Sequence, residues 1–307
     1  MSLRAFPAAA ALFALLASPL ATAEPFALAA AYDQTYRVDL ATRTAMLVGE
    51  NGTLFGQPVV IKGMAYSATG QPYAASDNLK SLLRLETSAL SVVRVGGFGL
   101  EGQGDPGNYD SLDLGFTINC EGTHFLSSAY AQKLWRVDPN TGGASVIGPL
   151  GAKITGLAAK GRELYGMGSL GDDGLYKIDP VTGVATVIRR YPELVGRASY
   201  LLPAFDAGGQ LWAVITYNPS VNWSDLARID LSTGAMTILG PITGPEDLRN
   251  IGIRGFAING PGVCPAGEPT TTEIPAGSPV GYSLMAGFLA LLGWRRLRRR
   301  NAPDRAV

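Results

Sequence analysis

The sequence predicts an all-β protein: a β-propeller of five four-stranded blades, closed by the C-terminal strand and followed by a C-terminal transmembrane helix. Three observations lead to this fold class. A two-strand motif recurs along the chain, and the two ends of the repeat array are incomplete in complementary ways. In addition, 39 glycines and 20 prolines among 307 residues disfavour long helices in the body of the chain.

The recurring motif is a pair of short strands around an acidic residue. It reads TYRVDLATRTAMLVG, LLRLETSALSVVRVG, LWRVDPNTGGASVIG, LYKIDPVTGVATVIR and LARIDLSTGAMTILG. Its acidic anchors, about 41 to 52 residues apart, are Asp39, Glu86, Asp138, Asp179 and Asp230. A period of this length is typical of propeller blades.

Each motif has the features of a hairpin. Its residues alternate in polarity with the period of a strand, and the Asp-Pro-x-Thr-Gly stretch provides an acceptor, a fixed φ and a glycine for the tight turn. A second hairpin precedes most motifs, as in GMAYSATGQPYAAS and GLAAKGRELYGMGS. Each unit therefore has four short strands.

The ends of the array indicate how the ring closes. The first motif follows a single strand, PFALAAA at residues 25–31, and the last motif precedes a single strand, GIRGFAI at residues 252–258. Together these strands complete a fifth blade and remove the open sheet edges. A six-bladed ring with one degenerate unit and an open β array are the alternatives.

The motifs resemble the extracellular bacterial propeller-like proteins that carry recurring LYRIDPxTGxxTxIG units. The resemblance covers residues 25–260 and implies the architecture and an exported location. It leaves the chemistry open, because propellers carry many unrelated functions.

The N-terminus has the pattern of a secretory signal peptide. Arg4 precedes an apolar run at residues 8–20, and the small residues of Ala21-Thr22-Ala23 precede Glu24. We expect cleavage after Ala23, so that residues 1–23 are the signal peptide and residues 24–260 form the propeller domain.

The C-terminus has the pattern of a membrane anchor. Residues 280–294 (VGYSLMAGFLALLGW) are uncharged and are predicted to form a transmembrane helix. Residues 261–279 form a linker with a sorting motif, and residues 295–307 form a basic tail, which the positive-inside rule places in the cytoplasm. The body of the chain is therefore expected outside the inner membrane.

This tail resembles bacterial PEP-CTERM and IPTL-CTERM sorting tails. The residues that carry the resemblance are Ile274, Pro275, Ser278, Gly281, Arg295, Arg296, Arg298, Arg299 and Arg300. The chain departs from the IPTL pattern at Ala276-Gly277 and at Pro279-Val280. The resemblance implies an exported, membrane-tethered or released surface protein and, as a partner, an exosortase-like membrane sorting protease.

Composition disfavours several functional classes. Lys and Arg together number 25, as do Asp and Glu. Because Arg4 and the C-terminal arginines lie outside the body, the body is net acidic and unsuited to nucleic acid.

His124 is the only histidine, expected in a strand at a blade edge, and it cannot supply a multi-histidine metal site. Three G-x-G-x-x-G matches lack a following helix. We expect no cofactor and no metal.

An acidic loop is a candidate calcium site, and two cysteines are a candidate disulfide. Glu101, Asp105, Asp110 and Asp113 could offer oxygen ligands to Ca²⁺, but they lack EF-hand spacing and are expected to form a solvated loop. Export permits a disulfide between Cys120 and Cys264, both expected on the face of the ring that carries the tight turns.

The long connections are the expected place of binding. Strand alternation puts the tight turns on one face and the long connections on the other, where binding residues usually lie. These connections are residues 49–61, 97–113, 189–201, 216–225 and 240–251. With two shorter loops, they supply the candidate ligand-binding residues Asp77, Tyr109, Asp110, Asp172, Asp173, Tyr191, Arg197, Tyr217, Trp223 and Arg249.

These observations favour a non-enzymatic binding protein of the bacterial cell envelope, with an extracellular carbohydrate or protein as its ligand. Trp223 and Tyr217 are the expected aromatic platforms. The alternatives are a propeller hydrolase or lyase that uses carboxylates, and a purely structural envelope protein. Two buried carboxylates in a channel pocket would favour the hydrolase, and aromatic and charged side chains on a broad face would favour binding.

Overall fold

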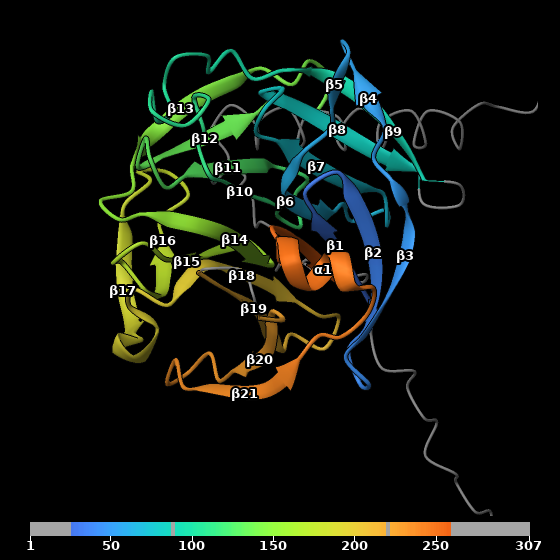
Figure 1. Cartoon of the computed structure of the whole chain (residues 1–307). Helices are drawn as coiled ribbons and strands as arrows, with labels where there is room; N and C mark the ends of the chain where they lie inside the picture. Colours follow the sequence, from blue (N-terminus) through green and yellow to red (C-terminus); the bar gives the residue numbers. More distant parts are fainter. Residues whose placement is uncertain (1–25, 87–89, 219–221, 259–307) are drawn as a thin grey trace, which may run out of the picture. The chain divides into compact units, whose positions relative to one another are not determined.

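The computed structural model describes residues 26–86, 90–218 and 222–258, and within them the chain forms a five-bladed β-propeller (Figure 1). Each blade is a four-stranded antiparallel sheet. The five-bladed prediction is confirmed, because the first strands of successive blades lie against one another in a closed ring. The six-bladed and open alternatives are wrong.

The first blade contains both ends of the described chain. Its strands, from the axis outward, are β22 (Gly255–Ile258), β1 (Phe26–Ala31), β2 (Gln34–Asp39) and β3 (Thr44–Glu50). In the register of β22 against β1, Ala29 faces Phe256 and Ala30 faces Gly255. The C-terminal strand closes the ring as the sequence predicts.

The other blades are each continuous in sequence. The second blade consists of β6 (Ile61–Tyr66), β7 (Pro72–Ser76), β8 (Ser81–Glu86) and β9 (Ser91–Gly97). The third blade consists of β10 (Leu114–Ile118), β11 (His124–Ser128), β12 (Lys133–Val137) and β13 (Ala144–Pro149). The fourth blade consists of β14 (Ile154–Lys160), β15 (Glu163–Gly168), β16 (Gly174–Ile178) and β17 (Ala185–Arg190). The fifth blade consists of β18 (Ala198–Phe205), β19 (Leu211–Tyr217), β20 (Asp225–Ile229) and β21 (Met236–Pro241).

Short elements lie in the connections between blades. They are the hairpin of β4 (Thr53–Leu54) and β5 (Gln57–Pro58), the 3₁₀ turn η1 (Pro192–Leu194) and the helix α1 (Glu246–Ile251). Because consecutive strands are antiparallel, all connections between blades lie on one face, which we call the loop face. The opposite face carries the tight hairpins and is called the turn face.

The repeated aspartates close the hairpins of the turn face. Asp138 Oδ1 accepts the backbone N–H of Asn140 at 2.8 Å, and Gly142 adopts φ 77° to complete the turn. Asp39, Asp179 and Asp230 accept equivalent backbone bonds two residues downstream. The pKa of each of these carboxyls is lowered, chiefly by hydrogen bonds from the turn that it caps.

The hydrophobic core is divided among the five interfaces between neighbouring blades. Between the second and third blades, for example, Leu82 packs with Phe116 and the fully buried Trp135. Between the fifth and first blades, Trp212 packs with Tyr36 and with Leu248 of α1. Each blade is therefore stabilised by its neighbours, as repeat architectures require.

The glycine that ends the motif has a packing function. A Cβ atom on Gly148 of the third blade would lie 2.0 Å from the carbonyl oxygen of Thr182, in the Thr-Gly turn of the fourth blade. Gly96 meets Thr141 of the third blade in the same way, at 1.8 Å. These contacts explain why the motif ends in glycine where the next hairpin docks.

None of the described helices is long and apolar enough to cross a bilayer. The predicted transmembrane helix at residues 280–294 lies outside the described residues, as do the signal peptide and the whole sorting motif. Those assignments stay predictions.

We predict that Gly148→Ala lowers the free energy of unfolding by about 2 to 3 kcal/mol, because the added methyl group must push two blades apart. The control is Gly143→Ala, whose Cβ would meet only the Thr141 hydroxyl, at 3.5 Å, and should cost less than about 0.5 kcal/mol. Urea unfolding followed by tryptophan fluorescence measures both. Equal stability of the two variants would contradict this account of the glycine.

Candidate functional site

The inner strands begin on the loop face and bring polar side chains to the mouth of the central channel. Lys62 lies near the start of β6, Asp113 directly precedes β10, and Arg254 directly precedes β22. Tyr200 comes from β18 of the fifth blade. Four different blades therefore contribute to one cluster.

Lys62 is the centre of this cluster. Its ammonium donates hydrogen bonds to Asp113 Oδ1 at 2.5 Å and to the Tyr200 hydroxyl at 2.7 Å, and Tyr200 in turn donates to Asp113 Oδ1 at 2.7 Å. Burial opposes the charge on Lys62, but the oxygens of Tyr200, Asp113 and Asp77 outweigh it, so its pKa is raised. The lysine is therefore a cation at neutral pH.

Asp77 holds a second part of the mouth together. Its Oδ1 accepts the Leu112 N–H at 2.9 Å, and its Oδ2 accepts the Ser111 hydroxyl at 2.8 Å and the Asp113 N–H at 3.2 Å. Lys80 lies 3.4 Å from Oδ1 and also donates to the carbonyl of Asp77. The carboxylate thus fixes the end of the long 97–113 connection against the turn between β7 and β8.

A cavity of about 550 Å³ opens beside this cluster, and we call it the channel-mouth cavity. It is lined by Tyr32, Gln57, Pro58, Val60, Lys62, Asp77, Asn78, Lys80, Asn108, Tyr109, Ser111 and Arg254. Its volume lies within the range of small-molecule sites. Two of the predicted binding residues, Asp77 and Tyr109, are therefore brought together here.

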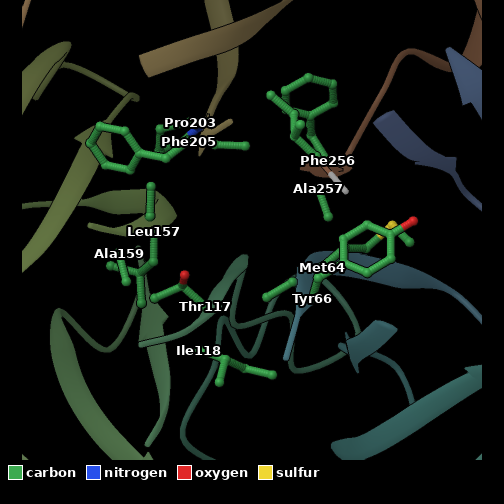
Figure 2. Close-up of a pocket in the computed structure, with 14 residues that line it drawn as sticks. Met64, Tyr66, Thr117, Ile118, Leu157, Ala159, Pro203, Phe205, Phe256 and Ala257 are labelled. Carbon is green, nitrogen blue, oxygen red and sulfur yellow. The ribbon is translucent and has the colours of Figure 1, made fainter. Parts of the chain in front are cut away.

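The channel below the mouth is narrow. Beneath Lys62, the inner strands leave a cavity of about 10 Å³, on the order of a single water molecule. Towards the turn face the channel is lined mainly by apolar side chains, including Met64, Leu157 and Phe256, with only Tyr66 and Thr117 carrying polar side-chain groups (Figure 2). A ligand the size of a sugar therefore has room at the loop face and not along the axis.

A second cavity, of about 330 Å³, lies on the loop face at the fifth blade, and we call it the blade-5 cavity. It is lined by Arg197, Tyr217, Asn222, Trp223, Asp225 and Pro241. The Tyr217 hydroxyl donates to Asp225 Oδ2 at 2.6 Å, and the Arg197 guanidinium lies 6.0 Å from the centre of the Tyr217 ring. Burial, with the adjacent carboxylate, raises the pKa of Tyr217. Three of the predicted binding residues meet here.

Other predicted binding residues act within the fold. Tyr191 is 1% exposed and donates its hydroxyl to the carbonyl of Gly234 at 2.9 Å, so it cannot offer its ring to a ligand on the surface. Asp110 accepts the backbone N–H groups of Gly102 and Gly104 and thereby shapes the 97–113 loop. Arg249 pairs with Glu246 on α1 at 2.9 Å. We leave these three residues out of the candidate site.

Asp172 and Asp173 lie on the loop between β15 and β16. Asp172 accepts the Lys153 N–H at 3.0 Å and pairs with Arg190 at 3.4 Å. Asp173 is 1% exposed, and burial raises the pKa of its carboxyl. Neither residue lines one of the two cavities.

His124 is not at a blade edge as expected. It begins β11, the second strand of its blade, with its ring 5.1 Å from the Tyr73 ring and 5.7 Å from the Phe116 ring. Burial lowers the pKa of the imidazole. These two aromatic neighbours belong to the core between the second and third blades, so the position of the sole histidine is typical of packing.

The acidic loop and the predicted disulfide are the remaining features of the sequence analysis. Within the described ranges, no group of three or more His, Cys, Asp or Glu side chains is placed to hold a metal ion, and Asp113 of the acidic loop is instead bound to Lys62. Cys120 lies on the turn face after β10, but Cys264 lies outside the described residues. The disulfide therefore stays a prediction.

Sequence reasoning missed the basic side chains of the channel mouth. The predicted site does not include Lys62, Lys80 or Arg254. Tyr200 lies within the predicted 189–201 connection but is not among the candidate binding residues. A signal was present, since Lys62 and Arg254 each directly precede the glycine of an inner strand, Gly63 and Gly255. A charged residue at the head of an otherwise buried strand indicates a polar cluster, because burial of an unpaired charge is costly.

We predict that Asp77→Ala lowers the free energy of unfolding by about 3 kcal/mol, because it leaves Lys80 without its buried partner and three donors without their acceptor. The comparison is Asp110→Ala, which removes a half-buried carboxylate from the 97–113 connection and should destabilise the protein less. Urea unfolding of both variants measures the difference. An Asp77→Ala variant as stable as Asp110→Ala would show that the anchor is unimportant.

Comparison with known proteins supports the architecture alone. No family profile and no curated protein matches the sequence. Among solved structures, a chain of the nidogen/laminin complex superposes with a TM-score of 0.50 at 13% identity, covering 76% of this chain and 98% of that chain. A virginiamycin B lyase from Staphylococcus aureus superposes with a TM-score of 0.42 at 13% identity. The superposition covers 70% of this chain and 65% of the lyase chain. At these identities the chain shares the β-propeller fold with its structural relatives, and the fold does not specify a function.

Proposed function

We propose that the protein is an exported, non-enzymatic β-propeller of the bacterial cell envelope that binds an extracellular carbohydrate or protein through its loop face. The single observation that carries the proposal is the blade-5 cavity, where Tyr217, Trp223 and Arg197 line a hollow of about 330 Å³. All three residues belong to the long connections that the sequence analysis expects to bind a ligand.

The chemistry of the blade-5 cavity suits recognition of a polar ligand. Trp223 is partly buried against the core that the first and fifth blades share, so its position is fixed before a ligand arrives. Tyr217 is oriented by its hydrogen bond to Asp225. Pre-oriented aromatic rings contribute contact area at low conformational cost, and the adjacent Arg197 and Asn222 offer hydrogen-bond donors.

The hydrolase alternative has one observation in its favour. Asp77 and Asp113 are both buried at the channel mouth, and both approach the Ser111 hydroxyl, at 2.8 and 3.4 Å. However, both oxygens of Asp77 accept hydrogen bonds from the chain itself, and Asp113 Oδ1 is held by Lys62 and Tyr200. A general acid or base must exchange protons with the substrate, and these contacts favour a structural use of the pair.

The location of the protein rests on its two ends. The signal-peptide pattern before Glu24 supports export, and the apolar segment and arginines after residue 279 support tethering or sorting by an exosortase-like protease. Because β22 runs from the loop face to the turn face, the chain leaves the ring on the turn face. A tethered propeller would therefore present its loop face away from the membrane. A purely structural envelope protein would have no need of fixed aromatic side chains there.

We predict that Trp223→Ala and Tyr217→Ala each weaken binding at least several-fold without unfolding the ring. The ligand is first found with a glycan array and with extracellular protein extracts, and its Kd is then measured by calorimetry. The control is Phe55→Ala, since Phe55 is an exposed aromatic residue, at 76%, that lines neither cavity. Undiminished affinity in both aromatic variants would place binding on another surface.

We also predict that deletion of residues 295–300 misplaces the protein, because the arginine cluster supplies orientation in the membrane and recognition by the sorting protease. Cell fractionation and the mass of the mature chain measure the effect. A variant with Arg84, Arg136 and Arg228 changed to Gln removes positive charge from the body instead and should be sorted normally. Unchanged fractionation and mass after the deletion would refute the sorting hypothesis.

A further inference from the structure

The charges around the channel-mouth cavity do not balance. Three cationic side chains line it, Lys62, Lys80 and Arg254. Lys62 is paired with Asp113 and Lys80 with Asp77. Among the described residues, no carboxylate lies within ion-pair distance of Arg254. Arg254 is therefore the one of these three cations that has no carboxylate partner among the described residues.

Arg254 is also short of hydrogen bonds. Its Nε is buried and has no hydrogen-bond partner among the described residues. The side chain lies beside Tyr200, with the guanidinium 5.7 Å from the ring centre, and its charge opposes that of the nearby Lys62. A cation beside another cation costs free energy, and a bound anion in the cavity would offset that cost.

A backbone hydrogen bond fixes the position of Arg254 at the wall of the channel-mouth cavity. Its N–H donates to the carbonyl of Ala30 at 2.8 Å, which continues the pairing of β22 with β1 by one residue. The arginine therefore lies directly before β22 and is held to β1 by its own backbone. Such preorganisation reduces the entropic cost of binding.

The remaining lining indicates what the anion is attached to. Gln57 and Asn108 offer amides, and Tyr32 and Tyr109 offer aromatic rings that are 44% and 98% exposed. Amides recognise hydroxyl groups, and tyrosine rings pack against the apolar faces of sugars. A volume of about 550 Å³ accommodates a ligand of one or two sugar rings.

We propose that the channel-mouth cavity is a binding site for a compact carboxylate-bearing sugar of the uronate class, whose carboxylate pairs with Arg254. The planar guanidinium suits a carboxylate, because it can donate two parallel hydrogen bonds. Lys62 and Lys80 contribute positive potential but remain bound to their own aspartates. The site is separate from the blade-5 cavity and goes beyond the proposed function.

The test uses calorimetric titration of the full-length protein with D-glucuronate and D-galacturonate. At least one uronate should bind at least tenfold more tightly than D-glucose or acetate, and Arg254→Gln should weaken that binding at least tenfold. Arg162→Gln is the matched control, since Arg162 is exposed, pairs with Glu121 and lies on the turn face. Trp223→Ala should leave uronate binding intact, which separates this site from the blade-5 cavity.

A stability measurement distinguishes a ligand site from a structural arginine. Because Arg254 is half-buried and has no carboxylate partner among the described residues, its removal should leave the melting temperature of Arg254→Gln equal to or above that of the wild type. Failure of both uronates to bind, equal binding to Arg254→Gln, or a markedly lowered melting temperature would overturn the proposal. Binding of acetate or inorganic phosphate as tightly as a uronate would equally overturn the assignment of a sugar acid.

Discussion

The close approach of the inner strands around the axis is the constraint on which the structure depends. A Cβ atom on Gly63 would lie 2.7 Å from Phe116 N, and one on Gly156 would lie 2.4 Å from the carbonyl oxygen of Leu201. A Cβ atom on Gly115 would also lie 3.0 Å from the Cα atom of Gly156 in the next inner strand. Only glycine permits these approaches, and they set the radius of a five-membered ring.

A narrow axis determines where polar chemistry can lie. Because the middle of the channel holds a cavity of only about 10 Å³, side chains that precede the inner glycines are pressed together at the loop face. Lys62 meets Asp113 and Tyr200 there, three residues separated by as many as 138 positions in sequence. The packing that closes the ring therefore also concentrates charge at one end of it.

The repeat made the fold predictable from the sequence, because the information is local and recurs. The hairpin of Asp138, Pro139 and Gly142 specifies its own turn by a side-chain cap, a fixed φ and a left-handed residue. The aspartate cap recurs in the first, fourth and fifth blades. Ring closure followed from the unpaired strands at the two ends. The loop face was predictable by the same alternation, which brought Tyr217, Trp223 and Arg197 to one cavity.

The channel-mouth cluster was harder to predict, because it depends on contacts between blades. Asp77 is an exposed loop aspartate by its sequence context, yet 3% exposed in the ring, where it receives hydrogen bonds from the third blade. Arg254 and Lys62 become neighbours only when the C-terminal strand completes the first blade beside the second. The sequence specifies strands and turns one blade at a time, whereas the charge balance at the mouth is a property of the closed ring. That Arg254 has no carboxylate partner within the described ranges is therefore visible only after closure, and the proposed uronate site rests on that observation.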